Sequence, residues 1–249
     1  MIKNKKIYFA SDAHLGFPTY EKSLEREKLF VKWLDEIKSD AQEIYLLGDI
    51  FDFWFEYKKV IPRGFTRFLG KISEITDQGI AVYFFTGNHD IWITDYLPKE
   101  TGVILHRKPV TKTINGKKFF LAHGDGLGPG DKGYKRLKKI FTNPILHWLF
   151  SRLHPNTAFK IAHKWSNSSR EAKGLVAENF KGVDKENLVI YAKEKLKHEH
   201  FDYMIFGHRH IPIDVKFNDN CQFINLGDWL THFTYAVFDG DKLELKKFK

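Results

Sequence analysis

The sequence contains very little cysteine and no long hydrophobic run. Cys221 is the one cysteine among 249 residues, so the chain cannot carry an internal disulfide framework, which suits a reducing compartment. No stretch approaches the roughly 18 consecutive apolar residues of a membrane-spanning helix. The first residues are basic and run into the strand-like Ile7-Tyr-Phe-Ala without an apolar signal region. We therefore expect a cytoplasmic protein.

Acidic residues are missing from one long segment. From Lys132 to Arg170 the chain has nine lysines and arginines and no aspartate or glutamate. The whole chain has 40 basic and 31 acidic residues, so the part outside this segment is neutral. The net charge of +9 therefore lies in one segment, which predicts an anionic partner. Nucleic acid, phospholipid headgroups and a phosphorylated substrate would each qualify.

The first third of the chain alternates between strand and helix patterns. Apolar runs predict strands at residues 6–12, 44–47 and 81–86, and helical spacing of apolar residues predicts helices over 20–38 and 65–78. This β-α-β-α-β order is typical of a parallel sheet with crossover helices. The sequence pattern thus predicts an α/β fold, and with 43% hydrophobic and 29% charged residues the composition is that of a soluble globular protein rather than a disordered one.

The remaining two thirds change character. An Asn115-Gly116 turn predicts a hairpin of strands 110–114 and 118–122, and a basic helical pattern follows from Tyr134 to about Lys173. A helix over 185–197 and a strand at 203–206 come next. Short strands are predicted at 215–217, 223–226, 234–238 and 243–247. We interpret residues 1–249 as a single domain of two β-rich halves closing on one another, with residues 126–175 as an inserted helical cap.

Polar residues suited to metal binding follow five of the predicted strands. Taken singly, each group is more often a turn, a helix cap or a structural polar residue. Together they supply carboxylates, an amide and imidazoles, a mixture that suits Mn, Fe, Co, Ni or Zn better than Mg or Ca. Residues two apart in an extended or turning backbone point the same way, so each i, i+2 pair can reach one ion. The five groups are Asp12-x-His14, Gly48-Asp49, Gly87-Asn88-His89-Asp90, His123-Gly124 and Gly207-His208-x-His210.

In this order, the five groups resemble the signature of the calcineurin-like metallophosphoesterases. The resemblance implies a four-layer α-β-β-α sandwich with an inserted helical cap and two divalent ions. By position, it implies one ion held by Asp12, His14, Asp49 and His210, and a second held by Asp49, Asn88, His123 and His208. Asp49 then bridges the two, since a carboxylate has two oxygens to share.

The same resemblance implies the catalytic roles. The ions lower the pKa of a shared water, which attacks phosphorus, while Asp49 and Asn88 hold the centre together. His89 follows Asn88 and is placed to protonate the leaving oxygen, with Asp90 orienting it. Asp52, Asp125 and Asp228 are either turn and cap residues or supports for the ligands, and the sequence leaves this open.

Within the family, further stretches are similar to the UDP-2,3-diacylglucosamine diphosphatases of lipid A biosynthesis. They are Ser11-Asp-Ala-His-Leu-Gly, Gly48-Asp-Ile-Phe-Asp-Phe-Trp, His123-Gly-Asp-Gly-Leu and Leu226-Gly-Asp-Trp. The resemblance implies hydrolysis of a UDP-linked diacylated sugar to UMP and 2,3-diacylglucosamine 1-phosphate, with Mn²⁺ as the usual metal. It implies substrate contacts from Asn88, His89, Asp131, Tyr134, Ser166, Arg170, Lys173 and His208. The best-known branch has arginine where this chain has His89, and Arg170 replaces an expected amide.

The basic cap fits such a substrate. Its lysines and arginines can bind a diphosphate. They can also bind the anionic surface of the inner membrane on its cytoplasmic face, where each surface Lys or Arg contributes about 1 kcal/mol of binding free energy. Its apolar residues (Ile140, Phe141, Ile145, Leu146, Trp148, Leu149, Phe150 and Leu153) can line a groove for acyl chains or form the cap's own core.

Other functions remain open at this point. Two alternatives are a phosphoesterase for another phosphodiester or nucleotide, and a metal-free scaffold, although no metal-site position is lost. The basic segment lacks the regular arginine and aromatic interleaving of a stacking groove, so no nucleic acid partner is expected. The sequence does not specify the resident metal, the acyl-chain preference or the oligomeric state.

Overall fold

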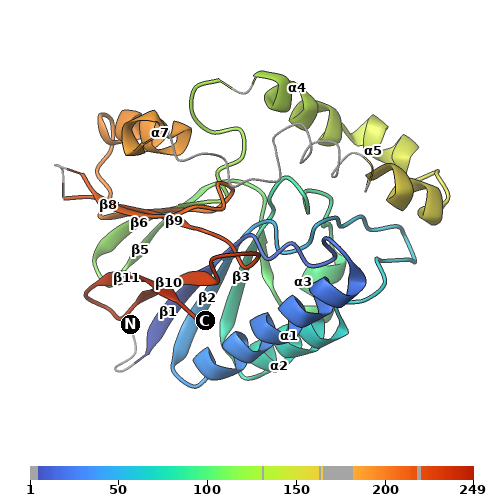
Figure 1. Ribbon diagram of the computed structural model, residues 1–249, viewed down its shortest axis with the longest axis horizontal. Coiled ribbons are helices and arrows are strands. Elements are labelled where there is room, and N and C mark those ends of the chain that lie inside the picture. Colours follow the sequence, from blue (N-terminus) through green and yellow to red (C-terminus); the bar gives the residue numbers. More distant parts are fainter. Residues whose placement is uncertain (1–4, 131, 163, 165–181, 218–219) are drawn as a thin grey trace.

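The computed structural model describes residues 5–130, 132–162, 164, 182–217 and 220–249. Two β-sheets face each other, and helices cover both outer faces (Figure 1). The first sheet has the order β11-β10-β1-β2-β3-β4, and the second has the order β5-β6-β7-β9-β8. The layers are therefore α-β-β-α, as the resemblance implied.

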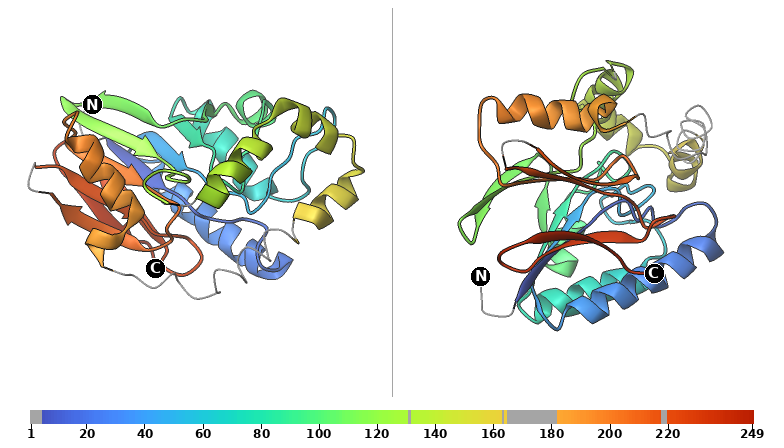
Figure 2. Two further views of the ribbon diagram at one scale, coloured as in Figure 1. Left: turned by 90° about the horizontal axis from the view of Figure 1, so that it is seen from above. Right: turned by 60° about the vertical axis from the view of Figure 1, so that its left-hand side comes forward.

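The first sheet is built from the predicted β-α-β-α-β segment. Strands β1 (Lys6–Ala10), β2 (Ala41–Leu47), β3 (Ala81–Phe85) and β4 (Ile104–His106) run parallel. Helices α1 (Tyr20–Ile37) and α2 (Thr66–Asp77) make the crossovers and lie together on the outer face (Figures 1 and 2). Thr19 caps α1 by accepting a hydrogen bond from the Lys22 N–H at 3.4 Å. Parallel strands put their carboxyl ends at one edge, which is where the polar motifs lie.

The two sheets do not correspond to the two halves of the sequence. The second sheet contains β5 (Val110–Ile114), β6 (Lys117–Ala122), β7 (Tyr203–Phe206), β8 (Pro212–Lys216) and β9 (Gln222–Leu226). The last two strands, β10 (Thr234–Phe238) and β11 (Leu243–Lys247), instead join the first sheet, with β10 antiparallel to β1. The prediction of two sequential β-rich halves was therefore wrong for the final hairpin. This hairpin covers the edge of β1 that would otherwise be open to pairing with another chain.

Three hydrophobic clusters fill the three interfaces between the four layers. Alternate residues of a strand point to opposite faces, so Ile7 and Phe9 of β1 lie between the sheets while Tyr8 and Ala10 face α1 and α2. On the second sheet, Phe120 faces outward against the cluster that includes helix α7 (Asn187–Leu196). Each fully buried large apolar side chain contributes about 1.5–3 kcal/mol. The strands that carry the site are therefore anchored on both faces.

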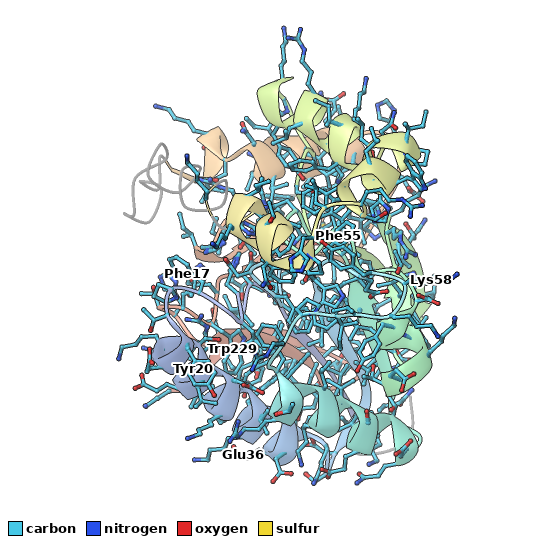
Figure 3. All side chains as sticks on the ribbon, turned by 90° about the vertical axis from the view of Figure 1, so that its right-hand side faces the viewer. Phe17, Tyr20, Glu36, Phe55, Lys58 and Trp229 are labelled. Atoms are coloured by element: carbon cyan, nitrogen blue, oxygen red, sulfur yellow. The ribbon has the colours of Figure 1, made fainter. Side chains whose placement is uncertain are left out.

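The cap lies over one end of the sandwich. It includes α4 (Lys132–Phe141), α5 (Pro144–Phe150) and a helical stretch at 155–162 (Figure 1). Its inner side packs on two aromatic residues of the core, because Phe150 lies 4.9 Å from Phe55 and 5.0 Å from Trp92 between ring centroids. Figure 3 shows Phe55 beneath the cap helices. Residues 131, 163 and 165–175 of the predicted insertion lie outside the described residues.

Several smaller elements differ from the sequence prediction. Helix α3 (Tyr96–Thr101), strand β4 and the short 3-10 helix η1 (Val183–Lys185) were not predicted, and β8 begins at Pro212 rather than residue 215. β8 lies at the edge of its sheet, where a proline at the first position is tolerated. In the described part of the chain, no helix is long and apolar enough to cross a bilayer.

Candidate metal centre

The polar motifs meet where five parallel strands end. Asp12 follows β1, Asp49 follows β2, Asn88 follows β3, His123 follows β6 and His208 follows β7. β1, β2 and β3 belong to one sheet and β6 and β7 to the other, so the motifs converge from both sheets. The carboxylates Asp12 and Asp49 are fully buried, and His14 and His123 are nearly so.

One group of side chains gathers around Asp12. The Nε2 atoms of His14 and His210 are 3.2 Å apart. The Oδ1 atom of Asp12 lies 3.2 Å from His210 Nε2 and 3.8 Å from His14 Nε2. These three residues place one ligand atom each within 4.8 Å of one another, close enough to share a metal ion.

A second group gathers around His123. Its Nε2 lies 3.2 Å from Asp49 Oδ2 and 3.4 Å from Asn88 Oδ1. His208 completes the group, with its ligand atom within 4.8 Å of those of Asp49 and His123. His208 and His210 therefore fall into different groups. The argument that i, i+2 residues reach one ion holds for Asp12 and His14 but was wrong for this pair, although the resemblance had assigned the two histidines to different ions.

Asp49 stands between the two groups. Its Oδ2 atom is 3.9 Å from His14 Nε2 in one group and 3.2 Å from His123 Nε2 in the other. Its Oδ1 atom accepts a hydrogen bond from the His89 N–H at 2.8 Å. Oδ2 is thus the oxygen of Asp49 that faces both groups, and the bridging of two ions by this carboxylate stays a prediction.

The buried carboxylates fit a cation. In the described residues, Asp12 Oδ1 and Asp49 Oδ2 are buried without a hydrogen-bond partner, which is unfavourable unless a positive charge lies beside them. Burial by itself would raise the pKa of both carboxyls, but the histidines around them hold each pKa well below its usual range. Although burial opposes it, the nearby carboxylates raise the pKa of His123 and of His210 to about 10. The site is organised around positive charge.

The backbone of the site is strained. Among the described residues other than glycine, nine have φ in the left-handed region, and five of them belong to these two groups. That region is uncommon for residues with a side chain and costs free energy that the surrounding fold must offset. Backbone strain is concentrated at functional sites, and here the strained residues are ones whose side chains form the two groups. The five are Asp12, His14, Asp49, His208 and His210.

Two glycines allow backbone segments to approach the carboxylates closely. A Cβ added to Gly87 would lie 2.2 Å from Asp49 Oδ1, and one added to Gly207 would lie 2.6 Å from Asp12 Oδ2. The N–H groups beyond these glycines then reach the acids, since His208 N–H donates to Asp12 Oδ2 at 2.9 Å. A larger residue at either position would move the carboxylate.

Comparison with known proteins is consistent with this geometry. A family model described as calcineurin-like phosphoesterase matches residues 5–212. The chain belongs to this family. It is 40% identical to a UDP-2,3-diacylglucosamine hydrolase of Porphyromonas gingivalis over 98% of both chains. It is 29% identical to a protein of the same name from Vibrio parahaemolyticus over 96% of both chains.

His89 of this phosphoesterase is supported by a different aspartate from the one predicted. Its Nδ1 lies 2.9 Å from the main-chain oxygen of Asp52, and its ring meets that of His14 edge-on at 4.7 Å. Asp90 instead accepts hydrogen bonds from the N–H groups of Gly87, Ile50 and Phe51. The prediction that Asp90 orients His89 was wrong. Asp90 fixes the turn that carries Asn88 and His89, and burial together with the Asp49 charge raises its pKa to about 7.

The three aspartates left open by the sequence all lie behind the centre of the phosphoesterase. Asp52 Oδ1 is 3.3 Å from His14 Nδ1, and Asp228 Oδ2 is 3.5 Å from His210 Nδ1. Asp125 is buried in the loop after His123 and accepts hydrogen bonds from the Tyr134 hydroxyl and from Lys138 Nζ, the latter at 2.6 Å. None of these pairings could be read from the sequence, because each joins segments that are distant or separated by a loop.

The predicted substrate contacts are only partly described. Asn88, His89 and His208 lie at the centre, and the Tyr134 ring is 6.4 Å from that of His208. Tyr134 therefore brings helix α4 of the cap next to the metal centre. Asp131, Ser166, Arg170 and Lys173 lie outside the described residues.

Proposed function

We propose that this phosphoesterase hydrolyses the pyrophosphate bond of UDP-2,3-diacylglucosamine to UMP and 2,3-diacylglucosamine 1-phosphate. The observation that carries the proposal is the pair of buried oxygens Asp12 Oδ1 and Asp49 Oδ2, which accept no hydrogen bond in the described residues and lie among converging imidazoles. The substrate is supported by 40% identity to a relative whose name states that activity, over nearly the whole of both chains.

In this proposal two divalent ions occupy the centre. Asp12, His14, His210 and Asp49 would hold one, and Asp49, Asn88, His123 and His208 would hold the other. When bound, such a pair lowers the pKa of water and offsets the charge of the phosphate oxygens. We propose Mn²⁺ as the resident ion, and the mixed nitrogen and oxygen ligands also suit Fe, Zn, Co or Ni.

The residues of the chain have separate tasks in the reaction. The oxygen of a water molecule forms a bond to phosphorus, and the bond between that phosphorus and the bridging oxygen breaks. Asn88 and His208, besides holding the second ion, also contact the phosphate and orient it. His89 donates its Nδ1–H to the Asp52 carbonyl, so its Nε2 is the nitrogen that passes a proton to the leaving oxygen. Holding the imidazole in one orientation makes that transfer efficient.

Recognition of the sugar and nucleotide falls to the cap. We propose contacts from Tyr134, Asp131, Ser166, Arg170 and Lys173, in addition to Asn88, His89 and His208. The position of Tyr134 beside His208 supports this arrangement, because it places the cap next to the reacting phosphate.

The solvent-exposed residues of the cap support a second part of the proposal, contact with an anionic membrane surface. We call this set of residues the outer cap face. It carries seven of the eleven large hydrophobic side chains that are exposed in the described residues, a concentration typical of interaction surfaces. Cations lie among them and acids do not, so the surface is complementary to anionic lipid at the cytoplasmic face of the inner membrane. Its residues are Leu137, Ile140, Ile145, Leu146, Trp148, Leu149 and Leu153, with Lys132, Arg136, Lys139 and Arg152.

The apolar residues of the cap thus divide into two sets. Phe141 and Phe150 pack on Trp92, whose indole N–H donates to the Phe141 carbonyl at 2.7 Å, so these two belong to the contact between cap and core. The other six residues that the sequence suggested for an acyl groove are exposed. We propose that they meet lipid, whether acyl chains of the substrate or of the membrane.

The test is product release from the proposed substrate. Purified protein supplied with Mn²⁺ should release UMP from UDP-2,3-diacylglucosamine presented in detergent micelles. Brisk cleavage of a generic aryl phosphodiester with no UMP from the lipid substrate would contradict the proposal and favour a different phosphoester. Absence of both activities in metal-loaded protein would favour a scaffold.

A further inference from the structure

The imidazoles of the two metal groups differ in the partner of the ring nitrogen that points away from the centre. In the Asp12 group, both histidines have a carboxylate on the ring nitrogen that points away from the centre. Asp52 Oδ1 lies 3.3 Å from His14 Nδ1, and Asp228 Oδ2 lies 3.5 Å from His210 Nδ1. Both carboxylates are nearly inaccessible to solvent, with side chains 3% and 4% exposed, so water screens them little.

The other group lacks such a pairing. The charge of the buried Asp125 acts on His123 and His208 from nearby, but its carboxylate accepts hydrogen bonds from Tyr134 and Lys138 instead. His123 Nδ1 lies 2.7 Å from the main-chain oxygen of Leu47, a neutral acceptor. Within the ranges that the structure describes, no carboxylate is paired with the outward nitrogen of His123 or His208. The amide of Asn88 takes the place of a second acid there, so the carboxylate of Asp49 is the only charged ligand of this group, and it is shared.

Supporting carboxylates change how a histidine binds metal. A carboxylate that accepts the Nδ1–H fixes the tautomer with its lone pair on Nε2, holds the ring in place and makes Nε2 a stronger donor. It also adds negative charge close to the ion. The Asp12 group has these contributions twice, beyond its two acidic ligands Asp12 and Asp49.

We propose that Asp52 and Asp228 are positioning residues that make the Asp12–His14–His210 site the tighter of the two metal sites, so that the centre fills in a fixed order. The inference rests on the proposed dinuclear centre and concerns its assembly rather than its substrate. The first ion holds Asp12, His14 and His210 in place, and Asp49 is shared with a second ion that exchanges more readily.

Asp228 offers the sharper variant because its two oxygens have separate contacts. Its Oδ1 accepts hydrogen bonds from the N–H groups of Thr231 and His232, at 2.8 and 2.9 Å, and lies 3.3 Å from His232 Nδ1, so it shapes a turn. In Asp228→Asn the amide oxygen can keep those two bonds. The NH₂ group then faces His210 Nδ1 as a donor, which favours the tautomer with its proton on Nε2, the wrong form for a metal ligand.

The chain contains a matched control for this substitution. Asp239 Oδ1 also accepts hydrogen bonds from two N–H groups shortly after it, those of Asp241 and Lys242, both at 2.9 Å, although Asp239 is exposed. No histidine is paired with Asp239 in the described residues. Asp239→Asn therefore repeats the local change without the change at a ligand.

The experiment is a Mn²⁺ titration of the full chain after removal of metal with a chelator, followed by calorimetry. The wild type should show two classes of site, one tighter than the other. Asp228→Asn should weaken the tighter class by about 10- to 100-fold and leave the weaker class unchanged. Asp52→Asn should act in the same way, and Asp239→Asn should have no effect. Thermal unfolding without metal identifies any variant that has lost its fold. If Asp228→Asn does not fold, the effect of Asp52→Asn on the tighter class tests the proposal.

The outcomes separate this inference from the proposed function. Two sites of equal affinity in the wild type, or an effect of Asp228→Asn and Asp52→Asn on neither class or on the weaker class, would overturn the order of filling while leaving a dinuclear centre in place. Failure of the wild type to bind two ions would instead contradict the proposed function itself.

Discussion

His89 is the residue proposed to donate a proton in the reaction, a role that metal binding alone does not require. It lies in the turn between Asn88 and Asp90, with its main-chain N–H on Asp49 and its ring nitrogen Nδ1 on the Asp52 carbonyl. The first contact couples it to the shared carboxylate, and the second sets the direction of its ring. Its side chain is 20% exposed, so it can meet a substrate, whereas His14 and His123 are almost fully enclosed.

His89→Ala should lower the turnover rate most for substrates whose leaving oxygen must be protonated before it departs. General-acid catalysis contributes about 10²- to 10⁴-fold, so the turnover of the pyrophosphate substrate should fall within that range. An aryl ester with a good leaving group should lose far less, because its oxygen departs without a proton. The measurement is kcat for both substrates, with the exposed His198→Ala as a control. Equal losses on both substrates would remove the proposed role.

At this scale the sequence predicted which residues gather but not how they are held. Asp12, His14, Asp49, Asn88, His123, His208 and His210 follow the ends of apolar strands, and that pattern is local. The pairing of Asp228 with His210, and of Asp52 with His14, depends on how separate turns pack against each other. The left-handed backbone of five of these residues also depends on the fold, since none of them is glycine.

At the scale of elements, the contact between α5 and the core decides where the cap stands. Phe150 and Leu149 are neighbours on α5 with opposite surroundings: Phe150 packs on Phe55 and Trp92, and Leu149 is 51% exposed. An aromatic pair contributes about 0.5–1.5 kcal/mol beyond burial, and Phe150 makes two such contacts. The helix therefore has one face fixed to the core and one face open.

Phe150→Ala should loosen the cap, and Leu149→Ala should not. We expect faster amide hydrogen exchange across α5 in Phe150→Ala, together with a raised KM for the lipid substrate, because recognition depends on the cap. Turnover of a small aryl phosphodiester should change little in either variant, since the metal ligands are untouched. Equal exchange rates in the two variants would contradict this role of Phe150.

The long elements were predictable from the sequence, and the short ones were not. Helices α1, α2 and α7 and the buried strands have clear apolar periods, so their positions were predicted to within a few residues. β4 has only three residues, and its Ile104 is 44% exposed, which leaves no alternation to detect. The place of β10 in the first sheet is a matter of topology, which periodicity does not encode.

At the scale of the whole molecule, charge is concentrated on the cap. The segment from Lys132 to Arg170 holds the entire excess of +9, and its described part includes the outer cap face and Tyr134, which lies beside His208 of the metal centre. A molecule with this distribution should approach an anionic surface cap first. That orientation would bring the metal centre close to a substrate embedded in lipid.

The protein should bind vesicles rich in anionic phospholipid and should not bind vesicles of zwitterionic phospholipid. Each surface cation contributes about 1 kcal/mol, so reversing two of them in Arg136→Glu/Lys139→Glu should weaken binding more than about tenfold. Raising the salt to about 1 M, where screening acts within about 3 Å, should have a similar effect. Lys32→Glu/Lys242→Glu carries the same charge change on exposed residues outside the cap and should bind nearly normally. Equal weakening in both double variants would show that net charge alone is responsible.

The central claim is a two-ion centre joined by Asp49, and the metal content of Asp49→Asn tests it most directly. Asp49 Oδ2 faces both His14 and His123, so its loss should affect both sites, whereas Asp228→Asn should affect one. After loading with Mn²⁺ and dialysis, elemental analysis should find two ions per wild-type chain. Asp49→Asn should retain less at both sites and should be inactive. One full equivalent bound to Asp49→Asn with wild-type affinity would contradict the account.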